Sequence, residues 1–172
     1  QVYRDALVWA SGKPVTIRML DLGGDKQIAG IGASDRESFL GLRGVRLLLA
    51  RPEIARVQIR ALLRAAIDGD LKVLLPMVTF ADEFVAMRHL FEEEAAHLSR
   101  RAVLHKMPSL GIMVEVPAAA LMLDTFTDVG FFSLGTNDLA QYLTAAARDN
   151  PAVAGLYQQA GASVLRLIEN TV

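Results

Sequence analysis

The sequence predicts an α/β domain organised around a parallel sheet, because short apolar runs alternate along the chain with longer segments of helical periodicity. Four runs are almost continuously apolar, as expected for parallel strands covered on both faces, and they span residues 15–20, 71–77, 110–116 and 129–134. Residues 39–43 are a fifth and shorter candidate strand. An eight-stranded (β/α) barrel typically takes about 250 residues, so the predicted sheet is either open or an incomplete barrel.

Two helices between these strands are indicated by their apolar spacing and by their end signals. The first is predicted to begin at Pro52, which is tolerated in the first turn, and to end at residues 68–70, Asp-Gly-Asp. The second is predicted to begin near Thr79, which pairs with Asp82 three residues later in the pattern of a capping box. Its apolar side chains repeat at helical spacing and are predicted to face the core: Phe84, Met87, Phe91, Ala95 and Leu98.

The composition indicates one globular domain, residues 1–172, and excludes several classes of protein. The chain is 52% hydrophobic, which predicts a large core, and its net charge of −1 offers no basic surface for nucleic acid. Because it has no cysteine, disulfides and thiolate metal sites are excluded, and a reducing, cytoplasmic location is expected. Charged residues and a proline interrupt the most apolar stretch, residues 110–126, so no membrane insertion is expected. The first residues show no signal-peptide pattern and no initiator methionine, which suggests part of a longer protein.

Polar side chains follow the predicted strands, at the edge of a parallel sheet where ligands bind. Arg18 lies near the end of the first strand, Glu115 near the end of the third, and Asn137 and Asp138 follow the fourth. Carboxylates from different strands, together with substrate oxygens, are the usual ligands of Mg²⁺. Arginines such as Arg18 and Arg148 can bind phosphate or carboxylate groups through two parallel hydrogen bonds. The pattern therefore predicts a site for a phosphorylated anion with Mg²⁺.

Further residues fit this interpretation, and several other chemistries are excluded. Arg43 and Arg46 add positive charge, and Gly23-Gly24 permits a sharp turn close to a ligand. The motifs of serine hydrolases, zinc proteases, P-loop proteins and Rossmann dinucleotide-binding proteins do not occur. The histidines, His89, His97 and His105, are expected to be solvated rather than part of the site.

Five blocks of the sequence, in order along the chain, closely resemble the phosphoenolpyruvate-binding domain of enzyme I of the bacterial phosphoenolpyruvate:sugar phosphotransferase system. These blocks are residues 16–26, 39–46, 76–77, 111–120 and 131–142. Pyruvate phosphate dikinase and phosphoenolpyruvate synthase share some of them, but the Gly-Gly-Asp-Lys block and Gln141-Tyr142 are more similar to enzyme I. Residues 151–168 also resemble enzyme I modules of fructose-type multiphosphoryl transfer proteins.

The resemblance implies a (β/α)₈ barrel that binds phosphoenolpyruvate and Mg²⁺ and passes the phosphoryl group to a histidine of a separate swivelling domain, leaving pyruvate. By motif position, Glu115 and Asp138 would be Mg²⁺ ligands, and the substrate would contact Arg18, Arg43, Asn137, Asp138 and Arg148. The resemblance further implies a phosphocarrier protein as a partner and a homodimer. About five of the eight βα units are expected within residues 1–172, without the first strand and the last two. The proton-donating cysteine is also expected elsewhere, so the segment alone is predicted to be inactive.

Some residues depart from the family pattern, namely Met19, Glu37, Ser38, Ala140 and Ala147. Two alternatives therefore remain open. One is a degenerate or regulatory dimerisation module without turnover, which these departures and the absence of cysteine favour. The other is a metal-dependent barrel lyase of the pyruvate-aldolase type, which also places a Glu and an Asp around Mg²⁺ beneath a pyruvate-like ligand.

Overall fold

The structure is a computed structural model in which residues 1–22 and 39–171 are described. Its sheet has four parallel strands in the order β1-β2-β3-β4, namely β1 (Val15–Arg18), β2 (Leu71–Leu75), β3 (Ser109–Val114) and β4 (Phe131–Leu134). Strands that are consecutive in the chain are neighbours in the sheet, as they are around a barrel. The predicted fold class, an incomplete (β/α) barrel, is therefore confirmed, with four strands among the described residues.

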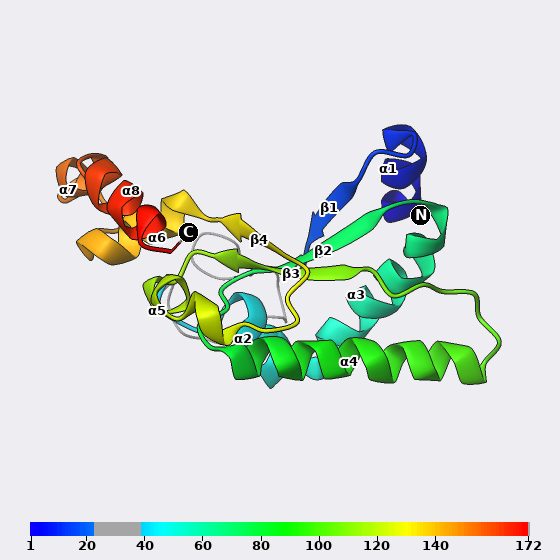
Figure 1. The fold of residues 1–172 in the computed structure, drawn as a ribbon. Helices are drawn as coiled ribbons and strands as arrows, with labels where there is room; N and C mark the ends of the chain where they lie inside the picture. Colours follow the sequence, from blue (N-terminus) through cyan, green and yellow to red (C-terminus); the bar gives the residue numbers. More distant parts are fainter. Residues whose placement is uncertain (23–38, 172) are drawn as a thin grey trace.

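Helices connect the strands and lie around the sheet (Figure 1). They are α1 (Val2–Ala10), α2 (Gly44–Ala50), α3 (Pro52–Ala65), α4 (Ala81–Arg100), α5 (Pro117–Leu121), α6 (Thr136–Thr144), α7 (Ala154–Gln158) and α8 (Gly161–Glu169), with 3₁₀ turns at Ala66–Asp68 and Leu123–Thr125. In Figure 1, α1 lies at the end where the strands begin, and α6, α7 and α8 gather at the opposite end. None of the helices in the described part of the chain is long and apolar enough to cross a membrane.

The predicted strand at residues 39–43 is wrong, because these residues form turns and bends that lead into α2. Gly44, the first residue of α2, has a φ of +55°, and a Cβ atom there would lie 2.7 Å from Cβ of Met77. The N–H of Val45 donates to the carbonyl of Pro76 at 3.0 Å. The start of α2 therefore packs against the residues that follow β2, and residues 39–43 do not extend the sheet.

Helix α4 begins close to the predicted position, but a different carboxylate caps it. Glu83, not Asp82, accepts hydrogen bonds from the N–H groups of Thr79 at 2.6 Å and Phe80 at 3.0 Å. Phe80 is the N-cap residue, so Glu83 is the third helical residue and can reach back to the cap. Helix α3 begins at Pro52, as predicted.

The core lies between the central strands and helices α3 and α4. The predicted stripe on α4 is buried at Phe84, Met87, Phe91 and Leu98, and Ala95 is half-buried. Strands β2 and β3 are buried on both faces almost throughout, as predicted. That prediction is wrong for the outer strands β1 and β4, which alternate half-buried and exposed residues. Successive side chains of a strand point to opposite faces of the sheet, so one face of each outer strand is less covered than the other.

Candidate functional site

A polar cavity of about 300 Å³ lies where the strands end. Its lining includes the six residues that the resemblance assigns to substrate or metal: Arg18, Arg43, Glu115, Asn137, Asp138 and Arg148. The strand ends, the start of α2, the first turn of α6 and the turn after α6 supply these side chains. The topology thus brings together residues that are up to 130 positions apart in the sequence.

Glu115 is the most deeply placed charged group of the site, with only 1% of its surface exposed. It follows β3 directly, and one of its carboxylate oxygens accepts a hydrogen bond from the N–H of Met77 at 2.7 Å. Burial raises the pKa of Glu115 to about 7; the Met77 bond opposes this rise, whereas the charges of Asp138 and Asp21 add to it. The site therefore contains negative charge that its own residues compensate only in part.

The backbone on both sides of Glu115 is shaped to admit this side chain. Met77 has a φ of +60°, a left-handed conformation that is uncommon for a residue other than glycine. On the other side lies Gly135, where a Cβ atom would be 2.5 Å from Cβ of Glu115 and 2.8 Å from its Oε2. Only a glycine at position 135 therefore leaves the Glu115 carboxylate in this place.

Arg43 connects two of the acidic side chains. Its guanidinium donates two hydrogen bonds to Asp21, at 2.7 and 3.1 Å, and lies 3.6 Å from Oδ2 of Asp138. Burial lowers the pKa of Arg43, but the bonds and charge of Asp21 outweigh it, so the pKa lies above the usual value. Nη1 of Arg43 and Oδ1 of Asp138 are buried without hydrogen-bond partners in the described structure, which suggests that a ligand satisfies them.

The other two arginines and Asn137 are more open. Arg18 is exposed, and its nearest carboxylate oxygen, on Asp21, is 3.9 Å away. Arg148 is also exposed, and no carboxylate in residues 1–22 or 39–171 pairs with it. Oδ1 of Asn137 accepts a hydrogen bond of 3.4 Å from the hydroxyl of Tyr157 in α7. These positions can therefore receive an anionic ligand without first breaking a strong ion pair.

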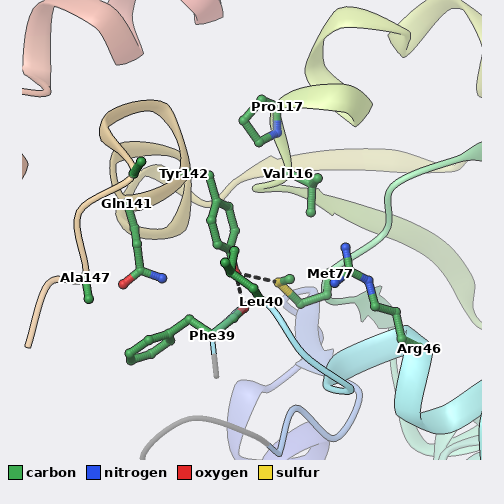
Figure 2. A pocket seen from close by; sticks show the side chains of 10 residues that line it. Phe39, Leu40, Arg46, Met77, Val116, Pro117, Gln141, Tyr142 and Ala147 are labelled. Carbon is green, nitrogen blue, oxygen red and sulfur yellow. Dashed lines mark hydrogen bonds between the residues drawn. The ribbon is translucent and has the colours of Figure 1, made fainter. Parts of the chain in front are cut away.

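Figure 2 shows a larger and mostly apolar pocket of about 520 Å³. Its lining residues Val116 and Ala147 are sequence neighbours of Glu115 and Arg148, which line the polar cavity. Arg46, which the sequence placed with the anion-binding residues, lines this apolar pocket and not the polar cavity. Its guanidinium donates to the hydroxyl of Thr79 at 3.1 Å and to the carbonyl of Gly41 at 3.4 Å. Arg46 is therefore bound to Thr79 and Gly41, and it lines a different pocket from Arg43, which lies only three positions earlier in the sequence.

Sequence reasoning assigned no role to Asp21, Phe39 or Tyr142, although all three lie in the blocks that carry the resemblance. Asp21 lies just beyond β1, a position that could have marked it as a site residue. The contacts of Phe39 with two arginines, and of Tyr142 with the Phe39 carbonyl, exist only in the folded chain, so no local sequence signal predicted them. Gly23, Gly24, Glu37 and Ser38 lie outside the described residues.

The acidic residues fit a magnesium ion better than a metal held by the protein alone. The described residues contain no group of three or more His, Cys, Asp or Glu side chains arranged to hold a metal. Two carboxylates, Glu115 and Asp138, line the cavity, and a buried oxygen of Asp138 has no partner. Mg²⁺ commonly takes only one or two carboxylates and completes its shell with water and substrate oxygens.

The fold and the cavity define a barrel-type domain with a polar cavity, lined by arginine, carboxylate and amide side chains, at the carboxyl ends of its strands. The chain belongs to the family described as "PEP-utilising enzyme, PEP-binding domain", whose model matches residues 1–172. It is 43% identical over 177 residues to the phosphoenolpyruvate-protein phosphotransferase of Streptococcus equinus, covering 100% of this chain and 31% of that protein. It is 44% identical over 173 residues to that of Geobacillus stearothermophilus, covering 99% of this chain and 30% of that protein. The resemblance inferred from the sequence is thus confirmed, and the chain spans about a third of the length of these curated relatives.

Proposed function

We propose that this chain binds phosphoenolpyruvate with Mg²⁺ and supports transfer of the phosphoryl group to a histidine of a separate swivelling domain, with release of pyruvate. The supporting observation is the polar cavity, in which arginines from three separate segments face two buried carboxylates. Phosphoryl transfer depends mainly on positioning and on neutralising negative charge, and this set of side chains provides both.

The carboxylates of Glu115 and Asp138 would hold the magnesium ion. When bound, Mg²⁺ neutralises charge on phosphate and carboxylate oxygens of the substrate. Asp138 offers a buried oxygen without a partner, and Glu115 offers a buried carboxylate whose raised pKa shows that its negative charge is unfavourable among the residues around it. Burial is the main cause of the raised pKa of Glu115, and a divalent cation would relieve the repulsion from Asp138 and Asp21 that adds to it.

The arginines would orient the substrate. Arg18 and Arg148 are free to bind the phosphate and carboxylate groups through paired hydrogen bonds. Arg43 is held by Asp21 and keeps one buried nitrogen, Nη1, without a partner, so it can add a contact without moving. Asn137 can donate its amide N–H to a phosphate oxygen, because its carbonyl oxygen faces Tyr157.

The remaining partners belong to the longer protein and are part of the same proposal. They are the swivelling histidine domain, a phosphocarrier protein and a second copy of the chain, in a cytoplasmic phosphotransferase system that transports sugars. In support, curated relatives are about three times as long as this chain. Large apolar side chains are also exposed on the outer strand β4, with Phe132 at 42% and Leu134 at 43%. Light scattering of the complete gene product measures its oligomeric state, and a strict monomer would contradict the homodimer.

Isothermal titration calorimetry of the complete gene product with phosphoenolpyruvate, with and without Mg²⁺, tests the ligand and metal. We expect binding to require Mg²⁺ and to weaken about tenfold or more in Glu115→Gln and Arg148→Gln, because each loses a charge-assisted contact. Glu169→Gln and Arg166→Gln, at exposed positions of α8, are matched controls that should bind like the wild type. Binding that ignores both the metal and the Glu115 substitution would reject the proposed function.

A pyruvate-release assay on the same protein tests turnover. We expect release to depend on the partner domain and carrier, and none from residues 1–172 alone. Magnesium-dependent ligand binding by the complete protein without pyruvate release would instead support the regulatory module.

A further inference from the structure

We propose that Phe39 and Tyr142 are positioning residues that hold the anion-binding arginines in place. This inference rests on the proposed function and names two residues that support its substrate site. Phe39 would act through its ring, on which both Arg43 and Arg148 lie. Tyr142 would act through its hydroxyl, which anchors the backbone of Phe39.

The Phe39 ring lies close to two guanidinium groups from distant segments. The central carbon of the Arg148 guanidinium is 5.2 Å from the ring centroid, and that of Arg43 is 5.9 Å away. Both distances are within the range in which the face of an aromatic ring attracts a cation. Two like charges near one cavity repel each other, and the attraction of each to the Phe39 ring offsets part of that repulsion.

This support matters most for Arg148. Arg43 is already fixed by two hydrogen bonds to Asp21. The guanidinium of Arg148, by contrast, has no carboxylate partner in the described part of the chain, and its described contact is with the Phe39 ring. Its backbone is also held, because its N–H donates to the side chain of Gln141 at 3.1 Å. Arg148 is therefore oriented and yet keeps its full charge for an anionic ligand.

Tyr142 fixes the segment that carries the ring. Its hydroxyl donates to the carbonyl of Phe39 at 2.7 Å and also lies 3.7 Å from the sulfur of Met77 (Figure 2). Figure 2 shows the hydroxyl between these two groups, with the Phe39 ring directed away from it. Residues 39–43 form no strand, so this bond connects an irregular segment to the rigid helix α6. Without the bond, the ring would lose its fixed place next to the two arginines.

The test measures binding of phosphoenolpyruvate and of inorganic phosphate to the complete gene product by calorimetry, in saturating Mg²⁺. Phe39→Leu should lower the affinity for both ligands about threefold to tenfold. Phe39→Trp should keep most of the wild-type affinity, because a larger ring still attracts the arginines. Tyr142→Phe should lower both affinities about threefold to fivefold, because only the hydrogen bond to the Phe39 carbonyl is lost. The control Phe80→Leu removes an exposed ring at the start of α4 and should change neither affinity.

Further readouts separate positioning from a general loss of structure. Affinity for Mn²⁺, measured by its effect on water relaxation, should stay within about twofold of wild type, because neither variant touches Glu115 or Asp138. The double variant should lose less than the product of the two single losses, because both act through the same ring. Unchanged phosphate affinity in Phe39→Leu, no rescue by Trp, or an equal loss of Mn²⁺ affinity would overturn the inference. If wild type bound inorganic phosphate but not phosphoenolpyruvate, the proposed function would fail, while the phosphate series would still decide the role of Phe39.

Discussion

Glu115 shows how a single side chain can link stability to ligand binding. It is buried beside Asp138 and Asp21, and its pKa is raised from 4.5 to about 7 by burial above all. A carboxyl whose pKa is higher in the folded state binds more protons there than in the unfolded state. Folding is therefore least favoured when this group is ionised and no cation is present.

The first prediction concerns pH and metal. Without Mg²⁺, the free energy of unfolding should fall as pH rises from about 4.5 to about 7, and the Glu115 contribution amounts to about 3 kcal/mol at most. Glu115→Gln should be more stable than wild type above pH 7, and Mg²⁺ should stabilise only the wild type in this range. Urea unfolding at a series of pH values measures the difference between the two proteins. A difference that does not change with pH would contradict the raised pKa.

The second prediction concerns the neighbour of Glu115. Gly135→Ala places a methyl group 2.5 Å from Cβ of Glu115, so the carboxylate must move or the chain must shift. We expect a loss of about 1–3 kcal/mol in stability, and a weaker affinity for Mg²⁺ as well. Gly155→Ala in α7 is the matched control, because nothing lies within 4 Å of its added methyl group. Thermal unfolding and calorimetry check both effects; unchanged metal affinity in Gly135→Ala would show that the glycine is only a turn residue.

Between elements, a buried ion network joins α3 to α4. Glu94 of α4 is 4% exposed and accepts hydrogen bonds from Arg56 at 2.7 Å and Arg60 at 2.9 Å, both on α3. Burial raises the pKa of Glu94, but the two arginines together lower it below the usual value. The network contributes stability above the usual pKa of a glutamate, and this is lost as pH falls through the lowered value.

The third prediction follows from this network. Glu94→Gln should cost about 1–2 kcal/mol at pH 7, less than a fully buried pair because both arginines are about one-third exposed. Glu93→Gln, an exposed neighbour with one bond to Arg56, should cost about 0.5 kcal/mol or less. Chemical denaturation at pH 7 and at pH 3 measures both, and the Glu94 effect should shrink at the lower pH. Equal effects of the two substitutions would show that burial does not strengthen the network.

Across the whole molecule, the sheet is unevenly protected. Strands β2 and β3 are paired on both sides and buried, whereas β1 and β4 each have one neighbour in the sheet and expose alternate residues. The candidate site spans this difference, since Glu115 follows a central strand and Arg18 ends an outer one. Glu115 therefore follows a better-protected strand than Arg18, and than Asp138, which lies in the helix after the outer strand β4.

The fourth prediction tests this difference by hydrogen exchange on the 172-residue chain. Amides of β2 and β3 should exchange at least about tenfold more slowly than those of β1 and β4, because local opening needs fewer contacts to break at an outer strand. Mass spectrometry of peptides from each strand measures the rates. Equal protection of β1 and β3 would mean that the outer strand is covered in solution, as self-association would do.

Much of the fold could be predicted because its signals are local. Continuous apolar runs predicted the four strands, and Pro52 and the stripe on α4 predicted two helices. The failures have tertiary causes. Residues 39–43 were predicted as a strand but form turns and bends, and the start of α2 after them packs against Pro76 and Met77. The capping carboxylate of α4 is Glu83 because the helix begins after Phe80, one residue later than the sequence indicated. Neither outcome is encoded in a short stretch of sequence.

By itself, the sequence determined the class of fold, the family and six of the residues that line the polar cavity. Strand order places the residues after each strand at one edge of the sheet, and the resemblance added Arg43. Only the tertiary structure decided how these side chains share their interactions. In the folded chain, Arg43 donates hydrogen bonds to Asp21, Arg46 donates to Thr79, and Arg148 lies over the ring of Phe39. The reason is physical: hydrogen bonds, ion pairs and burial depend on distances between atoms from separate segments, and those distances exist only once the chain has folded.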